Sequence, residues 1–588
     1  MSRSSSLRQS APRINVRLFV ARSPRSLRRP SRWAAVFLAL ASFLACANTA
    51  RVSIAASSEE EIIARINELL RQNWKDNDVT PSERADDGEF ARRVSLDIVG
   101  HIPSFNRLAQ FMGDASPDKR THFINELLDD PDYAEHFSTI WGNMLIGRAN
   151  NRRVNRGELE RWLKREFDKN APYDRFVFDL ISAEGDVSQN GAVAFLAAHL
   201  NDNAVPATAI TARIFLGMQV QCTQCHNHPF NDWKQSQFWG MNAFFRGTRR
   251  QGAGGNQRDQ FTLTDNDSES VVFFEKRSGL MEAITRQFVD GTLATGSSGD
   301  SPRVQLAKLV TDPSKPYMCE AIVNRMWSHF MGAGFTKPID DMGPHNPPSN
   351  PELIKFLATE FRTAGYDLKR LIRWIAGSES YSLTSRSHDG NKTDDPTTGN
   401  TPLFSRMYVK PFTAEQLYDS LIVATEAHKS GRNYEQSERQ RTEWLGQFVR
   451  AFGTDENDES TDFNGTVPQA LVMMNGDLIK NAISGDQGSF LRRVLDGSVL
   501  KPDESSAKSK SARPGTGSRT KPTPLKFAKG IPGKIEILYL TALARKPTSA
   551  ELSAFDKTFH NSGDRDPIHG LQDVFWALLN SNEFIFNH

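Results

Sequence analysis

The stretch Ser57–Trp74, "SSEEEIIARINELLRQNW", carries a clear fold signal in this chain of 588 residues. Two serines precede three glutamates, which is the pattern of a helix N-cap with a capping box. Apolar residues then recur at the spacing of one helical face: Ile62, Ile63, Ile66, Leu69 and Leu70. The stretch therefore predicts an amphipathic helix that packs one face against a core.

Helical periodicity of this kind dominates two long parts of the chain, residues 59–248 and residues 304–588. The intervening residues 249–303 differ. There, Gly- and Ser-rich loop sequences flank two short runs, Gln260–Asp265 and Ser270–Lys276, which have the composition of strands. We predict a mainly α, multi-helical protein of two domains, with a small β insertion near residues 256–275.

Two stretches interrupt the second helical part. Residues 386–402 include "SHDGNKTDDPTTGNTP", and residues 503–527 include "SSAKSKSARPGTGSRTKPTPLK". Both are polar and rich in turn-forming residues, and the second is basic with almost no apolar side chains. Because such segments have little apolar surface to bury, we predict flexible linkers at both places and disorder in the second.

The N-terminus has the layout of a secretory signal peptide over residues 1–47. Nine arginines and no acidic residue precede the apolar run Trp33–Ala47, "WAAVFLALASFLACA". That run ends in a small-x-small motif and is shorter than the roughly 20 residues of a membrane span. We therefore expect export to the periplasm, the cell envelope or the extracellular space, with an uncleaved membrane anchor as the alternative.

Export leaves a mature chain with three cysteines, Cys222, Cys225 and Cys319. An odd number argues against a disulfide framework. The formal net charge is +2, and the signal segment contributes nine arginines to it, so no basic field favours nucleic acid as a ligand. We expect a redox partner or a cell-envelope protein as the partner, and membrane contact only through an uncleaved signal segment.

Several stretches resemble a known family. "RRVSLDIVGHIPS" at 92–104 and "FLGMQVQCTQCHNHPFNDWKQSQFWGMNAFF" at 215–245 resemble the first of two domains that occur together in exported planctomycete proteins. The stretch 324–386, which begins "NRMWSHFMGAGFTKPIDDMGPHNPPSNPELIKFLATEF", resembles the second, as does the ending "LLNSNEFIFNH". The resemblance implies a cytochrome-related protein of two domains of unknown function. Many members also carry an N-terminal cytochrome c domain, which nothing between Asn48 and Arg92 resembles.

The sequence "CTQCH" at 222–226 is the chemical centre of the chain. In an exported protein, C-x-x-C-H is the attachment sequence of a c-type haem. Cys222 and Cys225 would form the thioether bonds and His226 would be the axial ligand of the iron. Met218 and Met241 flank the motif, but their apolar surroundings favour a core-filling role over distal ligation. This pattern predicts a redox or electron-transfer role.

Two other interpretations of the motif stay open. Haem-free zinc or iron is the first, with His226, alternatively His228 or Asp232, as ligands beside the cysteines. It would make the chain a metal-dependent enzyme, possibly hydrolytic. A tetrahedral site needs a second ligand pair, which "IDDMGPH" at 339–345 could supply, although a polar loop is the simpler interpretation of that stretch. The second is a disulfide or structural turn in a non-catalytic binding or scaffold protein.

Overall fold

The computed structural model describes residues 57–148, 154–252, 259–266, 271–294, 299–426, 476–500, 522–561 and 566–588, with three single positions between 427 and 475. The expected signal peptide and most of the expected linker 503–527 lie outside the described residues. Residues 57–588 form one compact unit.

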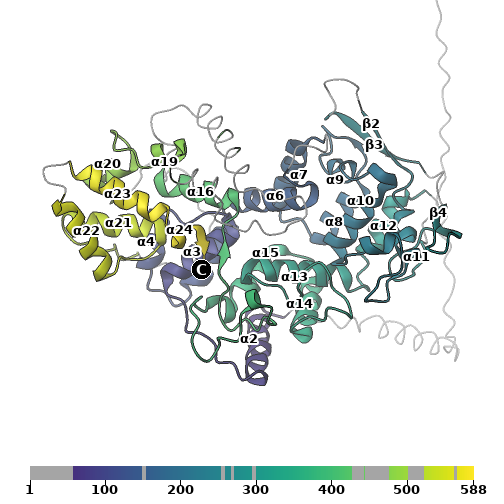
Figure 1. Cartoon of the computed structure of the whole chain (residues 1–588), viewed down its shortest axis with the longest axis horizontal. Helices are drawn as coiled ribbons and strands as arrows, with labels where there is room; N and C mark the ends of the chain where they lie inside the picture. Colours follow the sequence, from purple (N-terminus) through teal and green to yellow (C-terminus); the bar gives the residue numbers. More distant parts are fainter. Residues whose placement is uncertain are drawn as a thin grey trace, which may run out of the picture. The chain divides into compact units, whose positions relative to one another are not determined.

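Helices make up most of the first half of this unit (Figure 1). They are α2 (Glu59–Asp76), α3 (Asp87–Val99), α4 (Phe105–Gly113), α5 (Lys119–Leu128), α6 (Pro131–Ile146), α7 (Arg156–Asp168), α8 (Tyr173–Ser182), α9 (Val193–Ala197), α10 (Asn201–Thr211) and α11 (Gln235–Asn242). Helix α2 confirms the expectation from its sequence: Ser58 and Glu61 form the capping box, and Ile62, Ile66 and Leu70 are buried.

Helices also dominate the second half, so the prediction of a mainly α protein is confirmed. They are α12 (Pro302–Val310), α13 (Tyr317–Met331), α14 (Pro351–Thr363), α15 (Leu368–Ala376), α16 (Ala414–Thr425), α19 (Asp477–Ala482), α20 (Phe490–Asp496), α21 (Ile531–Leu543), α22 (Ser549–Asn561), α23 (Pro567–Leu579) and α24 (Asn582–Ile585).

The strands form small antiparallel sheets. They are β1 (Gly185–Asp186), β2 (Thr248–Gly252), β3 (Phe261–Asp265), β4 (Val271–Glu275), β5 (Met281–Thr285), β6 (Lys410–Pro411) and β7 (Phe586–Asn587). Strands β3 and β4 confirm the two strands expected in the insertion. They do not pair with each other, since β3 lies between β1 and β2 whereas β4 pairs with β5. Strand β1 belongs to the first helical part, so the insertion is tied to that part by backbone hydrogen bonds.

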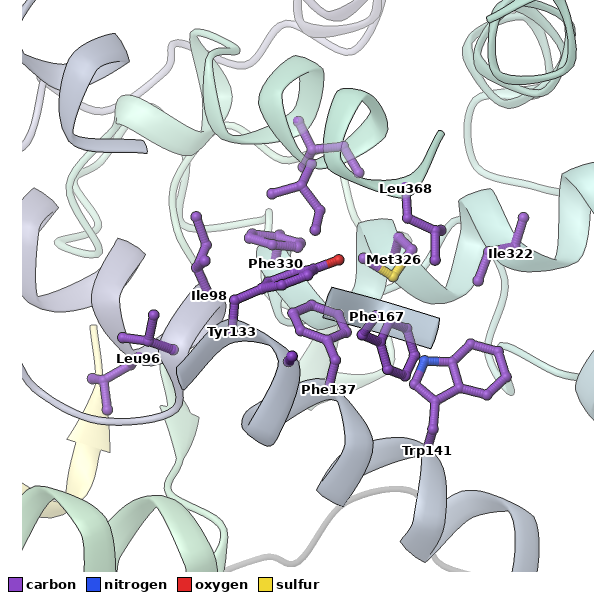
Figure 2. Close-up of a cluster of buried hydrophobic side chains, with 14 of the residues drawn as sticks. Leu96, Ile98, Tyr133, Phe137, Trp141, Phe167, Ile322, Met326, Phe330 and Leu368 are labelled. Carbon is purple, nitrogen blue, oxygen red and sulfur yellow. The ribbon is translucent and has the colours of Figure 1, made fainter. Parts of the chain in front are cut away.

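One hydrophobic core serves both helical parts (Figure 2). Leu96 and Ile98 of α3, Tyr133, Phe137 and Trp141 of α6 and Phe167 of α7 come from the first part, and Ile322, Met326 and Phe330 of α13 and Leu368 of α15 come from the second. All ten of these side chains are buried. The two parts therefore depend on the same buried apolar surface for their stability.

Two adjacent arginines at the start of the motif "RRVSLD" lie inside the protein. Arg92 donates hydrogen bonds to the carbonyl oxygens of Ala542 (2.8 Å) and Phe584 (2.6 Å). Arg93 donates to the carbonyl oxygens of Tyr381 (2.6 Å) and His588 (3.2 Å). Burial lowers the pKa of Arg92 to about 10. The two side chains hold the last helices and the chain's end against α3.

Residues 386–402, where composition predicts a flexible linker, contain buried polar anchors. The carboxylate of Asp394 accepts hydrogen bonds from the hydroxyl groups of Tyr408 (2.5 Å) and Ser405 (2.6 Å), and it is fully buried. Asn391, also fully buried, donates to the hydroxyl of Ser82 (2.8 Å). Asp and Asn occur in ordered tight turns as well as in solvated segments, so composition alone does not distinguish an ordered loop from a flexible linker.

Candidate functional site

The chain enters the Cys-Cys-His loop through an unusual backbone. The π-helix Ala212–Leu216 ends at Gly217, which has a left-handed conformation with a φ of +67°. A Cβ at this position would lie 2.8 Å from the sulfur of Met342, so both the backbone angle and the close packing require glycine. A 3₁₀ turn, Gln221–Gln224, follows. The buried Thr223 anchors it by donating a hydrogen bond to the carbonyl of Val220 (2.6 Å).

Cys222 and Cys225 are both exposed and free in this structure. Cys222 lies within the 3₁₀ turn and Cys225 directly follows it, so the two thiols belong to one short exposed segment. Cys319, by contrast, is buried on α13, and burial raises the pKa of its thiol to about 11. Two accessible thiols three residues apart can bond to one rigid group, or to each other.

His226 follows directly and is exposed. Its Nδ1 lies 2.6 Å from the carbonyl oxygen of Asn227. Because a carbonyl can only accept, Nδ1 is the donor, and Nε2 is left as the nitrogen that can bind a metal. This arrangement fixes the tautomer of His226 in the manner usual for metal-ligating histidines.

His228 has the opposite hydrogen-bonding pattern. Its Nδ1 accepts a hydrogen bond from the backbone N–H of Phe230 (3.2 Å). Burial, followed by the nearby imidazole of His345, lowers the pKa of His228, so its neutral form is favoured. Asp232, which the sequence also suggests as a ligand, is exposed on the same loop.

The loop at 338–346 packs directly against this site. The backbone N–H of Met342 donates to the carbonyl of Gly217 (2.7 Å), and the Gln219 side chain donates to the buried carboxylate of Asp340 (2.8 Å). These bonds set the spacing between two loops that are far apart in the sequence. The interpretation of this stretch as a polar loop holds for Asp340, because its carboxylate accepts a hydrogen bond from Gln219 on the other loop.

His345 and Asp341 on that same loop face the Cys-Cys-His loop. The ring centroids of His345 and His228 are 5.6 Å apart, and Nε2 of His345 lies 3.1 Å from Oδ1 of Asp341. Sequence alone indicates that these residues could supply a second ligand pair, and the structure brings them to the first. Among the described residues, no group of three or more His, Cys, Asp or Glu side chains is gathered as a ready metal site.

The methionines that flank the motif are parts of the core. Met218 and Met241 are buried in the main hydrophobic cluster, which agrees with their core-filling interpretation. An exposed group on Cys222 and Cys225 would not meet either sulfur without a rearrangement of that core.

Helix α11 fixes the other side of the loop. The Gln235 side chain donates to the carbonyls of Gln224 (3.2 Å) and Glu275 (2.9 Å), and the Trp239 indole also donates to Gln224 (3.1 Å). The cysteine turn is thereby tied to strand β4 of the insertion. The sequence gives no signal for this role of Gln235 and Trp239. Their partners are backbone carbonyls, which every residue has, so no residue pattern marks the contact.

Comparison with protein families finds two matches. Residues 65–250 match PSCyt2, described as a protein of unknown function (DUF1549), and residues 302–559 match PSD1, described as a protein of unknown function (DUF1553). No curated protein and no solved structure matches the chain. None of the helices in the described part of the chain is both long enough and apolar enough to cross a membrane.

The Cys-Cys-His loop lies within the PSCyt2 match, and the loop that contacts it lies within the PSD1 match. Both matched domains therefore contribute side chains to the candidate site. The chain carries these two domains of unknown function paired in sequence, which is consistent with the cytochrome-related two-domain family that its motifs resemble.

Proposed function

We propose that this chain is an exported redox protein that carries one covalently attached haem c on Cys222, Cys225 and His226. The observation that supports it is the local structure of the motif: two free, exposed thiols lie in and directly after one 3₁₀ turn, and the next residue is a histidine whose Nδ1 donates to a carbonyl. Thioether attachment needs both sulfurs accessible to one porphyrin edge, and iron ligation needs a free Nε2.

The residues around the turn fit such a group in part. The Phe230 side chain on the same loop is 81% exposed, which is unusual for an aromatic ring and offers apolar surface to a planar ligand. Met218 and Met241 are buried in the core and would not take part in holding the group. A bound haem would supply one-electron transfer, and Cys222, Cys225 and His226 would hold it.

Covalent attachment is tested by mass. In a host that matures c-type cytochromes, we expect a haem adduct on the peptide that contains Cys222 and colour that survives denaturation. Cys222→Ala and Cys225→Ala should lose most of the adduct, and His226→Ala should change the spectrum. Cys319→Ala is the matched control and should keep the adduct, because that thiol is buried in α13.

Other outcomes of the same experiment identify the alternatives. Stoichiometric zinc or iron without colour would favour the haem-free metal enzyme, with losses at His226, His228 or Asp232. A protein with neither colour nor metal would favour the structural turn of a binding protein. If the two cysteines form a disulfide, the peptide mass should be lower by about 2 Da, because two hydrogens are lost on pairing. An unmodified peptide from cells that mature other cytochromes would contradict the haem proposal.

Export is part of the proposal and has its own test. The arginine-rich lead and the apolar run Trp33–Ala47 favour signal cleavage. We expect N-terminal sequencing of the purified protein to begin between about Asn48 and Ala56, given the usual looseness of cleavage positions. Protein that retains Met1 in the cytoplasmic fraction would contradict export.

A further inference from the structure

The side chain of His345 is 14% exposed, but its two ring nitrogens are covered. Its Nδ1 and Nε2 are both buried, and neither forms a hydrogen bond, although Oδ1 of Asp341 lies 3.1 Å from Nε2. Buried polar atoms are almost always hydrogen-bonded, so a ring with two unsatisfied nitrogens calls for a specific cause, such as an ion or a water. The ring also faces a second imidazole, that of His228.

The separation of the two imidazoles suits a shared metal ion. Zn–N bonds of about 2.1 Å in a tetrahedral centre place the centroids of two ligating rings about 5 Å apart. The centroids of His228 and His345 are 5.6 Å apart, with ring planes inclined by 45°.

Metal binding would change the hydrogen bonding of His228. Nδ1 accepts from the backbone N–H of Phe230, so Nε2 carries the proton of the neutral ring, and ligation through Nε2 would move that proton to Nδ1 and replace this hydrogen bond. The loop of His345 is held in place by the Met342–Gly217 and Gln219–Asp340 hydrogen bonds. The two ligand-bearing loops are thus held at a set spacing whether or not an ion is bound.

We infer that His228, His345 and Asp341 form a binding site for a first-row divalent metal ion, with Zn²⁺ as the reference ion, across the contact between the two domains. Two imidazoles and one carboxylate favour such ions over Ca²⁺ and Mg²⁺, which prefer oxygen ligands. The three side chains are not gathered around one point in this structure, so the site requires side-chain rotations when the ion binds. Three protein ligands leave a position for water or another ligand.

The test uses the full mature chain, stripped with a chelator, and Zn²⁺ as the probe in calorimetric titration and elemental analysis. We expect one equivalent of Zn²⁺ to bind, and binding to raise the melting temperature. His228→Gln and His345→Gln should weaken affinity about 100-fold or more, and Asp341→Asn about 10-fold, as for lost ligands and orienting carboxylates. Circular dichroism and melting of the metal-free variants show whether each one folds.

His122→Gln is the matched control, because His122 also lies 3.0 Å from an aspartate four residues earlier, Asp118, but on the surface of α5. It should bind Zn²⁺ as the parent does, as should the Cys222→Ala and Cys225→Ala variants. Unchanged affinity in a folded His345→Gln variant, or no stoichiometric binding by the parent, would overturn the inference. Loss of binding in the cysteine variants would move the site to the thiolates and equally overturn this ligand set. The outcome is independent of haem attachment.

Discussion

Replacing Asp97 by alanine is expected to destabilise the fold by about 3–5 kcal/mol, the cost of breaking a buried charged pair by removing one partner. Asp97 is 1% exposed. Its Oδ1 accepts hydrogen bonds from the Lys410 ammonium (2.6 Å) and the Asn587 amide (2.8 Å), and its Oδ2 accepts from the Tyr381 hydroxyl (2.7 Å). One carboxylate thus joins α3, β6, β7 and the segment after α15.

The loss of stability in the Asp97→Ala variant arises from the former partners of the carboxylate, which stay buried without it. Without Asp97, Lys410 keeps a positive charge in a place where burial already lowers the pKa of its ammonium, and Tyr381 and Asn587 lose buried hydrogen bonds. Equilibrium unfolding in urea measures the change. The paired variant Asp97→Ala/Lys410→Met serves as the control, because removing both charges should recover a large part of the loss. A loss below about 1 kcal/mol would mean that solvent reaches this cluster.

Replacing Trp141 by alanine is expected to cost about 3–5 kcal/mol, the usual range for deleting a large buried aromatic side chain. The indole is 2% exposed and lies beside Phe167 in the buried cluster (Figure 2). Its ring centroid is 5.1 Å from that of Phe176, 5.8 Å from that of Tyr173 and 6.2 Å from that of Phe167. These neighbours are held by two packed helices, α7 and α8, and cannot collapse into the vacated volume, so a cavity is left.

Trp141→Phe is the matched control and should lose clearly less, because one aromatic ring still fills part of the site. Calorimetry should show one cooperative transition for the parent and for both variants, since the helices of both matched domains share this core. Two resolved transitions, with only one shifted by the substitution, would show that the PSCyt2 and PSD1 domains unfold independently and would contradict the shared core.

Local sequence determined the elements of this protein. The capping box at Ser58 and the 3.6-residue periodicity specify α2 without help from the rest of the chain. The β-branched and aromatic composition of two short runs does the same for β3 and β4, and the short motif at Cys222–His226 is evident from spacing alone. These signals work because the interactions that they report join residues a few positions apart.

Tertiary structure alone decided where those elements meet. The pairing of β6 with β7, the burial of Arg92 and the approach of His345 to His228 join segments far apart in the sequence. Periodicity says which face of a helix is buried, but it does not say against which partner. From sequence alone, an arginine such as Arg92 is expected on the surface. Its burial is explained only by the folded chain, which brings carbonyl oxygens to accept its hydrogen bonds. For the same reason, "IDDMGPH" was a polar loop in the sequence and becomes half of a candidate metal site only in the folded chain.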